Sequence, residues 1–251
     1  MRSLRALTVG LVLAIGGLLA GAAPASASSA EPTFSETRVY VNSVYVDLFG
    51  RDAERAGLDH WATLLFFRHQ PRVSVANAIT GSEEFRSTLI ADLYASYLGR
   101  EPDAAGLRFW LDKMAAGWTV AQIGSGFIAS DEYYAQAGST PAGWVQQLYG
   151  DVLGRGAAPD EVAFWVGQQA RGLSRPGVAI GFLLSTEHLS TVVDGYYEYL
   201  LGRSLDPTGQ ATWVGRLQAG GRDEDIIGGI LASEEYWNIA MTVPLPPPPA
   251  P

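Results

Sequence analysis

The sequence contains no cysteine and a single lysine, Lys113, among its 251 residues. Without cysteine the chain can form no disulfide framework, no cysteine-based zinc site and no thiol nucleophile. The formal net charge is −9. The composition therefore argues against a nucleic acid partner, whose phosphates need clustered basic residues, and against docking on an anionic lipid surface.

Charged residues are also few, at 17%, whereas 47% of the residues are hydrophobic and the mean hydropathy is +0.07. Such a chain has enough apolar surface to bury a core. After the N-terminal segment no stretch approaches the 18 unbroken apolar residues of a membrane span. We therefore expect the mature chain to have no membrane partner.

The N-terminal residues 1–27 have the pattern of a secretory signal peptide. Arg2 and Arg5 form a short positive region, residues 7–20 are apolar, and residues 25–27 read Ala-Ser-Ala, a small-x-small cleavage pattern. We predict cleavage after Ala27 and a secreted protein, extracellular or associated with the cell wall. An uncleaved anchor is the alternative, although the apolar region is short for a membrane span.

A unit of about fifty residues occurs four times along the rest of the chain. Each copy contains a Tyr, then Gly-Arg five residues later, then a Trp eleven residues after the Gly. A Ser-x-Glu triplet follows 20 or 21 residues after the Trp. Six positions are thus identical in all four copies: Tyr45, Gly50, Arg51, Trp61, Ser82 and Glu84; Tyr94, Gly99, Arg100, Trp110, Ser130 and Glu132; Tyr149, Gly154, Arg155, Trp165, Ser185 and Glu187; Tyr197, Gly202, Arg203, Trp213, Ser233 and Glu235.

The spacing between copies groups them into two pairs. From Ser to the next Tyr there are 12 residues at the first and third junctions but 19 at the middle one. The extra residues fall in the small, Pro- and Gly-containing segment 136–143, which predicts a loop. We expect two related modules, 31–137 and 141–241. The Pro-rich residues 243–251 predict an extended polyproline tail, a spacer or a ligand for a partner.

Helical periodicity runs through every copy. In copy two, apolar residues form one stripe over 89–98, Gly99 stands where a left-handed residue ends a helix, and Asp103 and Ser130 stand where they can cap the following helices. The β-like run 39–46 aligns with helical segments of the other copies. The predicted fold class is all-α, with about twelve short helices in four three-helix repeats arranged as two paired-repeat modules.

The four Gly-Arg arginines allow two interpretations. Each could grip an anion or stack on a sugar, or each could pair with the Ser-x-Glu glutamate of its own copy, to which its planar fork is suited. A catalytic site occurs once, whereas this set occurs four times, so we favour the structural interpretation. The repeated tryptophans predict core positions; Trp118, next to Gly117 in a loop, is the better candidate for an exposed aromatic contact.

The residue four before each repeat Ser is small and the next one is bulky and apolar, which predicts close helix–helix approach. The small residues include Gly126, and Gly124-x-Gly126-x-x-Ala129 matches a degenerate dinucleotide fingerprint. No strand precedes this match, so we expect its glycines to serve packing. The small residues are Ala78, Gly126, Gly181 and Gly229, and the bulky ones are Ile79, Phe127, Phe182 and Ile230.

Motifs for catalysis or metal binding do not occur. His60 and His188 stand at packing positions of the repeat, and His69 lies in a basic patch, residues 68–72, that we interpret as peculiar to copy one and as a solvated loop or an anion site. We therefore expect no catalytic residue, no cofactor and no metal site. An unpatterned pair of carboxylates acting as a glycosidase acid and base is an alternative that the sequence leaves open.

The string from Gly99 to Trp110, G-R-x-P-D-x-x-G-L-x-x-W, resembles a bacterial family, the domain of unknown function 4214. The resemblance covers about residues 37–240; copy three departs most, with Glu161 in place of the second Gly. It implies a secreted or cell-surface setting and brings no catalytic residues. The family is similar in pattern to the helical domain of phycobilisome linker polypeptides, whose role is assembly.

From these patterns we hypothesise a non-catalytic helical module for protein–protein interaction or scaffolding at the bacterial cell envelope. Its partner would be a protein or a glycan of the envelope. The alternative is a polysaccharide-binding protein or a polysaccharide-acting hydrolase of the same location.

Overall fold

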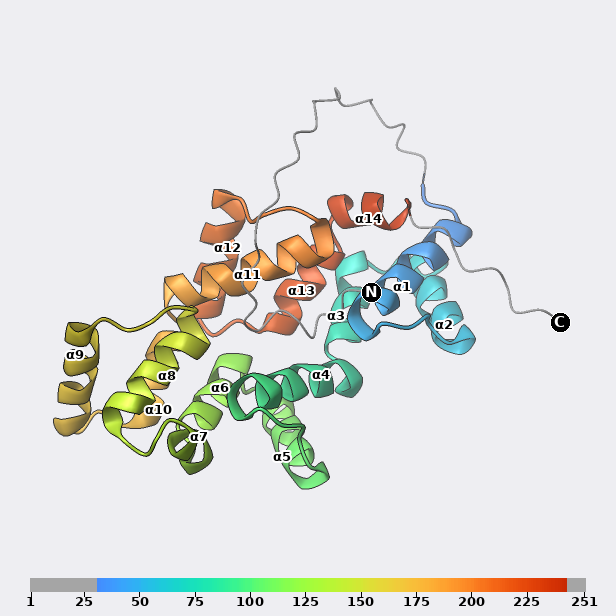
Figure 1. Cartoon of the computed structure of the whole chain (residues 1–251). Helices are drawn as coiled ribbons and strands as arrows, with labels where there is room; N and C mark the ends of the chain where they lie inside the picture. Colours follow the sequence, from blue (N-terminus) through green and yellow to red (C-terminus); the bar gives the residue numbers. More distant parts are fainter. Residues whose placement is uncertain (1–30, 243–251) are drawn as a thin grey trace.

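The computed structural model describes residues 31–242, and all regular elements within that range are helical. The all-α prediction is confirmed. The predicted signal peptide and the Pro-rich tail lie outside the described residues. Figure 1 shows the helices, in chain order α1 (Phe34–Phe49), α2 (Arg55–Phe66), α3 (Arg72–Thr80), α4 (Glu83–Leu93), a π-helical turn η2 (Tyr94–Leu98), α5 (Ala104–Ala115), α6 (Val120–Ile128), α7 (Asp131–Gln136), α8 (Pro141–Leu153), α9 (Pro159–Ala170), α10 (Arg175–Leu183), α11 (Thr186–Leu201), α12 (Pro207–Gln218), α13 (Asp223–Leu231) and α14 (Glu234–Ala240).

Each copy consists of a long helix, a helix that carries the repeat Trp, and a short third helix. The described range holds fourteen α-helices rather than about twelve, and the Ser-x-Glu segments explain the difference. After copies one and three this segment begins the long helix of the next copy, α4 or α11. After copies two and four it forms the separate short helices α7 and α14.

Local capping places the helix ends where the sequence predicts them. Gly99 has φ of 64° and ends the long helix of copy two, because a residue without Cβ adopts this left-handed conformation at little cost. The carboxylate of Asp103 accepts a 2.8 Å hydrogen bond from the Gly106 N–H, and Ser130 Oγ accepts one of 3.1 Å from Tyr133 N–H. These side chains satisfy amide groups that a helix start leaves free.

The predicted loop 136–143 is shorter in the structure. Helix α7 extends to Gln136, and α8 already begins at Pro141. Thr140 caps α8 by accepting a 3.0 Å hydrogen bond from Gly143 N–H, and a proline directly after the cap is preorganised for the first helical turn. Pro141 and Gly143 are thus helix-start residues, whereas Gly138, with φ of 82°, lies in the connection.

The third helices join copies that are distant in sequence. Helix α3 of copy one packs on α13 of copy four, and α6 of copy two packs on α10 of copy three. The helices that carry the repeat Trp, α2, α5, α9 and α12, pack on the long helix of their own copy and lie on the outside of the molecule (Figure 1). One continuous hydrophobic core runs through all four copies.

Two seams with matching contacts hold the copies together. At the middle of the chain, Trp144 Nε1 donates a 2.8 Å hydrogen bond to the carbonyl of Ile128. Where the first and last copies meet, Tyr40 Oη donates one of 3.1 Å to the carbonyl of Leu231. Trp144 lies 104 positions after Tyr40, and Leu231 lies 103 positions after Ile128. The two contacts are therefore equivalent, and they relate the halves by a pseudo-two-fold arrangement. We call these contacts the middle seam and the terminal seam.

The terminal seam corrects the expected basic patch of copy one. Arg72 forms an ion pair with Glu234, and its guanidinium lies 5.1 Å from the ring centroid of Trp237. Arg175, 103 positions later, makes the equivalent contacts at the middle seam, with Asp131 at 2.9 Å and Tyr134 at 4.5 Å. Arg72 is therefore a seam residue with a counterpart in copy three.

Glycines mark the closest approaches. A Cβ on Gly228 of α13 would collide with the side chain of Asn77 on α3, and one on Gly124 of α6 would lie 3.3 Å from Leu183 of α10. Gly126 and Gly229 instead leave room for the Trp ring of their own copy, since a Cβ there would lie 3.0 Å from Cη2 of that ring. The dinucleotide-like glycines thus have packing roles.

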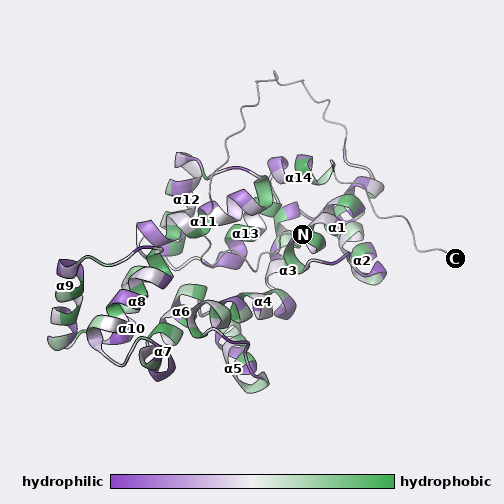
Figure 2. Ribbon diagram, in the orientation of Figure 1, coloured by the Kyte–Doolittle hydropathy of each residue, from purple (hydrophilic) through white to green (hydrophobic). Residues whose placement is uncertain are grey.

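Most helices combine hydrophobic and hydrophilic residues along their length (Figure 2). The bulky residues that precede each repeat Ser by three positions are all buried, and Trp144, Tyr40 and Phe85 are among the largest fully buried side chains. Within residues 31–242, no helix has the length and apolarity needed to cross a membrane.

Candidate functional site

The repeat positions meet in space in each copy. The arginine after the Gly forms an ion pair with the Ser-x-Glu glutamate 32 or 33 residues later, as the sequence predicts. The guanidinium also lies 4.8–5.4 Å from the ring centroid of the repeat Tyr. The four pairs are Arg51–Glu84, Arg100–Glu132, Arg155–Glu187 and Arg203–Glu235.

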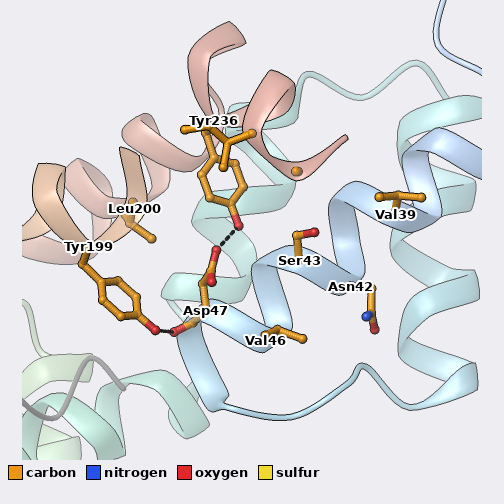
Figure 3. Close-up of a pocket in the computed structure, with 10 residues that line it drawn as sticks. Val39, Asn42, Ser43, Val46, Asp47, Tyr199, Leu200 and Tyr236 are labelled. Atoms are coloured by element: carbon orange, nitrogen blue, oxygen red, sulfur yellow. Dashed lines mark hydrogen bonds between the residues drawn. The ribbon is translucent and has the colours of Figure 1, made fainter. Parts of the chain in front are cut away.

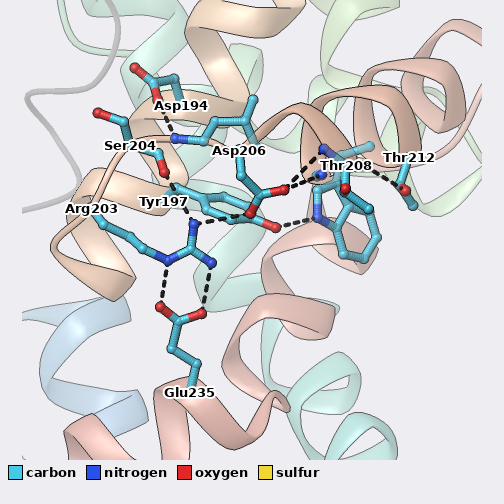
Figure 4. A network of polar contacts seen from close by, with 11 residues as sticks. Asp194, Tyr197, Arg203, Ser204, Asp206, Thr208, Thr212 and Glu235 are labelled. Carbon is cyan, nitrogen blue, oxygen red and sulfur yellow. Dashed lines mark hydrogen bonds and ion pairs between the residues drawn. The ribbon is translucent and has the colours of Figure 1, made fainter. Parts of the chain in front are cut away.

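Copy four shows the arrangement in detail (Figure 4). Arg203 donates two hydrogen bonds to Glu235, from Nε at 2.5 Å and from the terminal nitrogen at 2.8 Å. A further terminal nitrogen of Arg203 contacts Asp206 at 3.1 Å. The guanidinium lies 5.0 Å from the ring centroid of Tyr197, whose Oη accepts a 2.9 Å hydrogen bond from Trp213 Nε1. Trp61 and Trp165 make the same bond to Tyr45 and Tyr149, at 3.0 Å each.

The charges of this set stabilise one another. The hydrogen bonds from Arg203 and Arg100 lower the pKa of Glu235 and Glu132, and the amide N–H of Gly209 is the main cause that lowers the pKa of Asp206. All three carboxylates therefore stay ionised at neutral pH and hold their partners. A proton-transfer group would need a pKa nearer the working pH, so this geometry suits structure rather than acid–base chemistry.

Copy three reaches the same result with a different residue. The other copies have a glycine next to the Tyr hydroxyl: Gly57, Gly106 or Gly209. Copy three has Glu161 at this position, and its two oxygens lie 3.1 Å from the terminal nitrogens of Arg155. Glu161 also accepts a 2.8 Å hydrogen bond from Ala158 N–H, and these contacts lower its pKa to about 2. The departure from the family pattern is thus compensated within the copy.

The histidines are separate from one another. His188 lies in a half-buried position where its Nδ1 is 2.8 Å from the carbonyl of Val152, and burial lowers its pKa. His60 packs against Trp61 on the exposed side of α2, and His69 is exposed with φ of 50° in a tight turn. No group of three His, Asp or Glu side chains that could hold a metal ion occurs within residues 31–242.

Exposed aromatic rings lie on two of the outer helices. Phe109 of α5 is 52% exposed and Phe164 of α9 is 54% exposed. Trp118, the candidate from the sequence, is 37% exposed, and Lys113 lies between it and Phe109, 4.7 and 5.3 Å from the two ring centroids. We call Phe109, Lys113 and Trp118 the outer aromatic face; Phe164, on α9, lies apart from it (Figure 1).

The terminal seam contains a cavity of about 140 Å³ that the sequence interpretation missed (Figure 3). Tyr236 Oη donates a 2.6 Å hydrogen bond to the carboxylate of Asp47, and Tyr199 Oη donates one of 2.9 Å to its backbone carbonyl. Burial raises the pKa of Asp47. The signal available in the sequence was the alignment of Asp47 with Asp151 and of Tyr236 with Tyr133. At the middle seam, Tyr133 Oη donates the equivalent hydrogen bond to the Asp151 carboxylate, at 2.9 Å.

A second cavity, of about 80 Å³, lies between α4, α6, α10 and α11 and is lined mainly by apolar residues. Asp223 faces it and accepts a 3.0 Å hydrogen bond from Tyr196 Oη. Asp223 is 5% exposed, and burial raises its pKa to about 6. Next to it, the buried Glu224 contacts Arg222 at 2.8 Å and Arg86 at 3.2 Å. The sequence gave no sign of this buried charged group.

The fold and the fourfold set of paired side chains define a helical repeat protein. The family model described as "Domain of unknown function (DUF4214)" matches the chain four times, at residues 23–89, 86–137, 124–192 and 190–239. The chain belongs to this family, and each match spans one copy with its Ser-x-Glu triplet. No curated protein and no solved structure matches the chain.

Proposed function

We propose that this protein is a non-catalytic module that binds a partner protein at the bacterial cell envelope. One observation carries the proposal: the recurring polar side chains contact one another, Arg with Glu in all four copies and Tyr with Trp in copies one, three and four. A set committed to internal contacts four times over holds the repeats in shape. Recognition is then left to features that differ between the copies.

The outer aromatic face and the exposed Phe164 of α9 are such features, and we propose them as the contacts with the partner. Phe109 and Phe164 occupy the position before the repeat Trp in copies two and three, where copies one and four have His60 and Thr212. Aromatic side chains are enriched at protein interfaces and at the residues that contribute most to binding. The similarity in pattern to linker polypeptides with an assembly role supports a protein partner.

We further propose that the protein is secreted, because residues 1–27 have the pattern of a signal peptide. Expression in a bacterial host with a general secretion pathway tests this. The exported protein should begin at Ser28, within a few residues, when its N-terminus is sequenced. An exported or membrane-bound protein that still begins at Met1 would contradict cleavage and support the anchor.

Binding of a cell-envelope polysaccharide is the second candidate. Lys113 lies between the exposed Phe109 and Trp118 rings, and aromatic rings beside a cation can stack against a sugar ring. A hydrolase acting on such a polymer belongs to the same alternative, since two carboxylates flanking a sugar are its minimal apparatus.

A variant pair of matched design tests the proposal. The exported wild-type protein is cross-linked to envelope extract, and the captured protein is then tested as a purified partner. Phe109→Ala with Phe164→Ala should weaken binding of that partner by at least about tenfold. His60→Ala with Thr212→Ala changes the same position in the other two copies and should leave binding intact.

Equal binding by both double variants would refute the outer aromatic face and Phe164 as the contacts. A glycan array with the same proteins tests the second candidate. Glycan binding that is lost in Trp118→Ala, without any protein partner, would replace a protein ligand with a polysaccharide. Release of reducing ends from the bound glycan would refute a non-catalytic role.

A further inference from the structure

The two seams offer an internal comparison at the cavity. At the middle seam, Tyr133 donates a 2.9 Å hydrogen bond to the Asp151 carboxylate, and Gln147, four residues earlier on α8, acts to lower the pKa of that carboxyl. At the terminal seam, Tyr236 supplies the one side-chain hydrogen bond to Asp47 found among the described residues. The residue aligned with Gln147 is Ser43, whose side chain is short and has a hydroxyl in place of the carboxamide.

The cavity lies beside this difference. Ser43 and Asp47, four residues apart on α1, both line it, and Figure 3 shows them on the same stretch of that helix. A glutamine at the Ser43 position would extend a carboxamide toward the space. The Gln147 side chain of the middle seam thus has no counterpart at the terminal seam, where the cavity is present instead.

The chemistry of the lining defines what fits. The Asp47 carboxylate and the Ser43 hydroxyl accept hydrogen bonds, and Val39, Val46 and Ile239 supply apolar surface. Burial without enough hydrogen-bond donors is unfavourable for the ionised carboxylate, and a further donor would stabilise it. A volume of about 140 Å³ is close to that of a cavity known to accept benzene, roughly 150 Å³.

We propose that the terminal-seam cavity binds a small organic molecule that presents a nitrogen hydrogen-bond donor, either an ammonium or a primary amide, on a short branched apolar group. The nitrogen takes the place that the Gln147 carboxamide has at the middle seam and donates to Asp47. The apolar group lies against Val39, Val46 and Ile239. This site is separate from the outer aromatic face and does not depend on its function.

Nuclear magnetic resonance titration of the full mature chain tests the proposal with three probes: isobutylamine, isobutyramide and isobutyrate. Saturable shifts in residues of α1, α11 and α14 are expected with the amine or the amide. The tighter of the two identifies the donor as ammonium or carboxamide. Isobutyrate has the same apolar group with a carboxylate, and it should bind at least about tenfold more weakly because Asp47 repels it.

Two variants separate the site from general surface binding. Ser43→Gln copies the middle seam and should weaken binding at least about tenfold while the melting temperature is retained. Gln147→Ala, the matched change at the other seam, should leave binding of the probes at the terminal seam unchanged. If Ser43→Gln does not fold, Asp47→Asn serves instead, and should abolish the preference for the amine over isobutyrate.

The proposal is overturned by either of two results. One is the lack of saturable shifts with both the amine and the amide at millimolar concentration. The other is binding that persists undiminished in Ser43→Gln, or an Asp47→Asn variant that still prefers the amine to isobutyrate.

Discussion

Tyr236 donates a 2.6 Å hydrogen bond to Asp47, a residue 189 positions earlier in the chain. This bond ties α14, the last helix, to α1, the first, and it has an equivalent at the middle seam between Tyr133 and Asp151. The equivalence means that the protein closes on itself with the same contact that it uses between its halves. The described helices therefore form a ring of four copies with two seams.

Removing one hydroxyl at each seam should have unequal effects. Tyr236→Phe removes the one side-chain hydrogen bond to Asp47 found among the described residues, whereas Tyr133→Phe leaves Asp151 beside Gln147, which acts to lower the pKa of that carboxyl. We expect Tyr236→Phe to lower the free energy of unfolding by roughly 1–3 kcal/mol, the usual cost of an unsatisfied buried polar group, and Tyr133→Phe to cost less. Denaturant unfolding measures both. A larger loss in Tyr133→Phe would contradict the comparison of the seams.

The Arg–Glu pairs should contribute to stability. Arg100→Ala removes the two hydrogen bonds to Glu132 and the contact with the Tyr94 ring, so we expect a clearly lower melting temperature. Arg108, which contacts Asp112 and Glu83 on the surface of α5, is the control, and Arg108→Ala should have a smaller effect. An unchanged melting temperature in Arg100→Ala would refute the structural role of the repeated arginines.

The close approach of α13 to α3 predicts a sharp glycine effect. In Gly228→Ala the new Cβ would collide with the Asn77 side chain and lie 3.3 Å from its backbone nitrogen, so the helices must separate. We expect a loss of roughly 1–3 kcal/mol in the free energy of unfolding. Gly181→Ala, on α10 with no other atom within 4 Å of the new Cβ, should instead stabilise by about 0.5–1 kcal/mol. Chemical denaturation of both variants checks the contrast.

Asp223 should make stability depend on pH. Its folded-state pKa is raised from 3.8 to about 6 by burial among Tyr196, Glu224 and Arg222. The folded state therefore keeps a proton that the unfolded chain releases, and this group destabilises the fold increasingly as the pH rises from about 4 to 6. The destabilisation is complete above that window and amounts to up to roughly 3 kcal/mol.

Asp223→Asn removes the charge and keeps an acceptor for the Tyr196 hydroxyl. We expect it to raise the melting temperature at pH 7 relative to the wild type and to leave it nearly equal at pH 4, measured by thermal denaturation across this range. Asp225→Asn, in the same turn of α13, is the control. A difference between Asp223→Asn and the wild type that does not vary with pH would contradict the shifted pKa.

Local patterns and repetition along the chain are enough to predict the helical repeat and its internal contacts. Helix periodicity, the caps at Asp103 and Ser130, and the left-handed Gly99 are signals spread over a few residues each, so they act before any tertiary contact forms. The pairing of Arg100 with Glu132 followed from their recurrence in every copy. These features can be deduced from one chain because they depend on local geometry or on repetition.

Which copies pack against each other is visible only in the tertiary structure. Whether α3 packs on α13 or on a nearer helix depends on how all four copies fill a common core, which local patterns do not encode. The same closure places Asp47 against Tyr236, leaves the hollow beside Ser43, and buries Asp223 and Glu224 between the halves. Burial and the approach of residues 189 positions apart are properties of the assembled ring, and the features that distinguish one copy from another arise there.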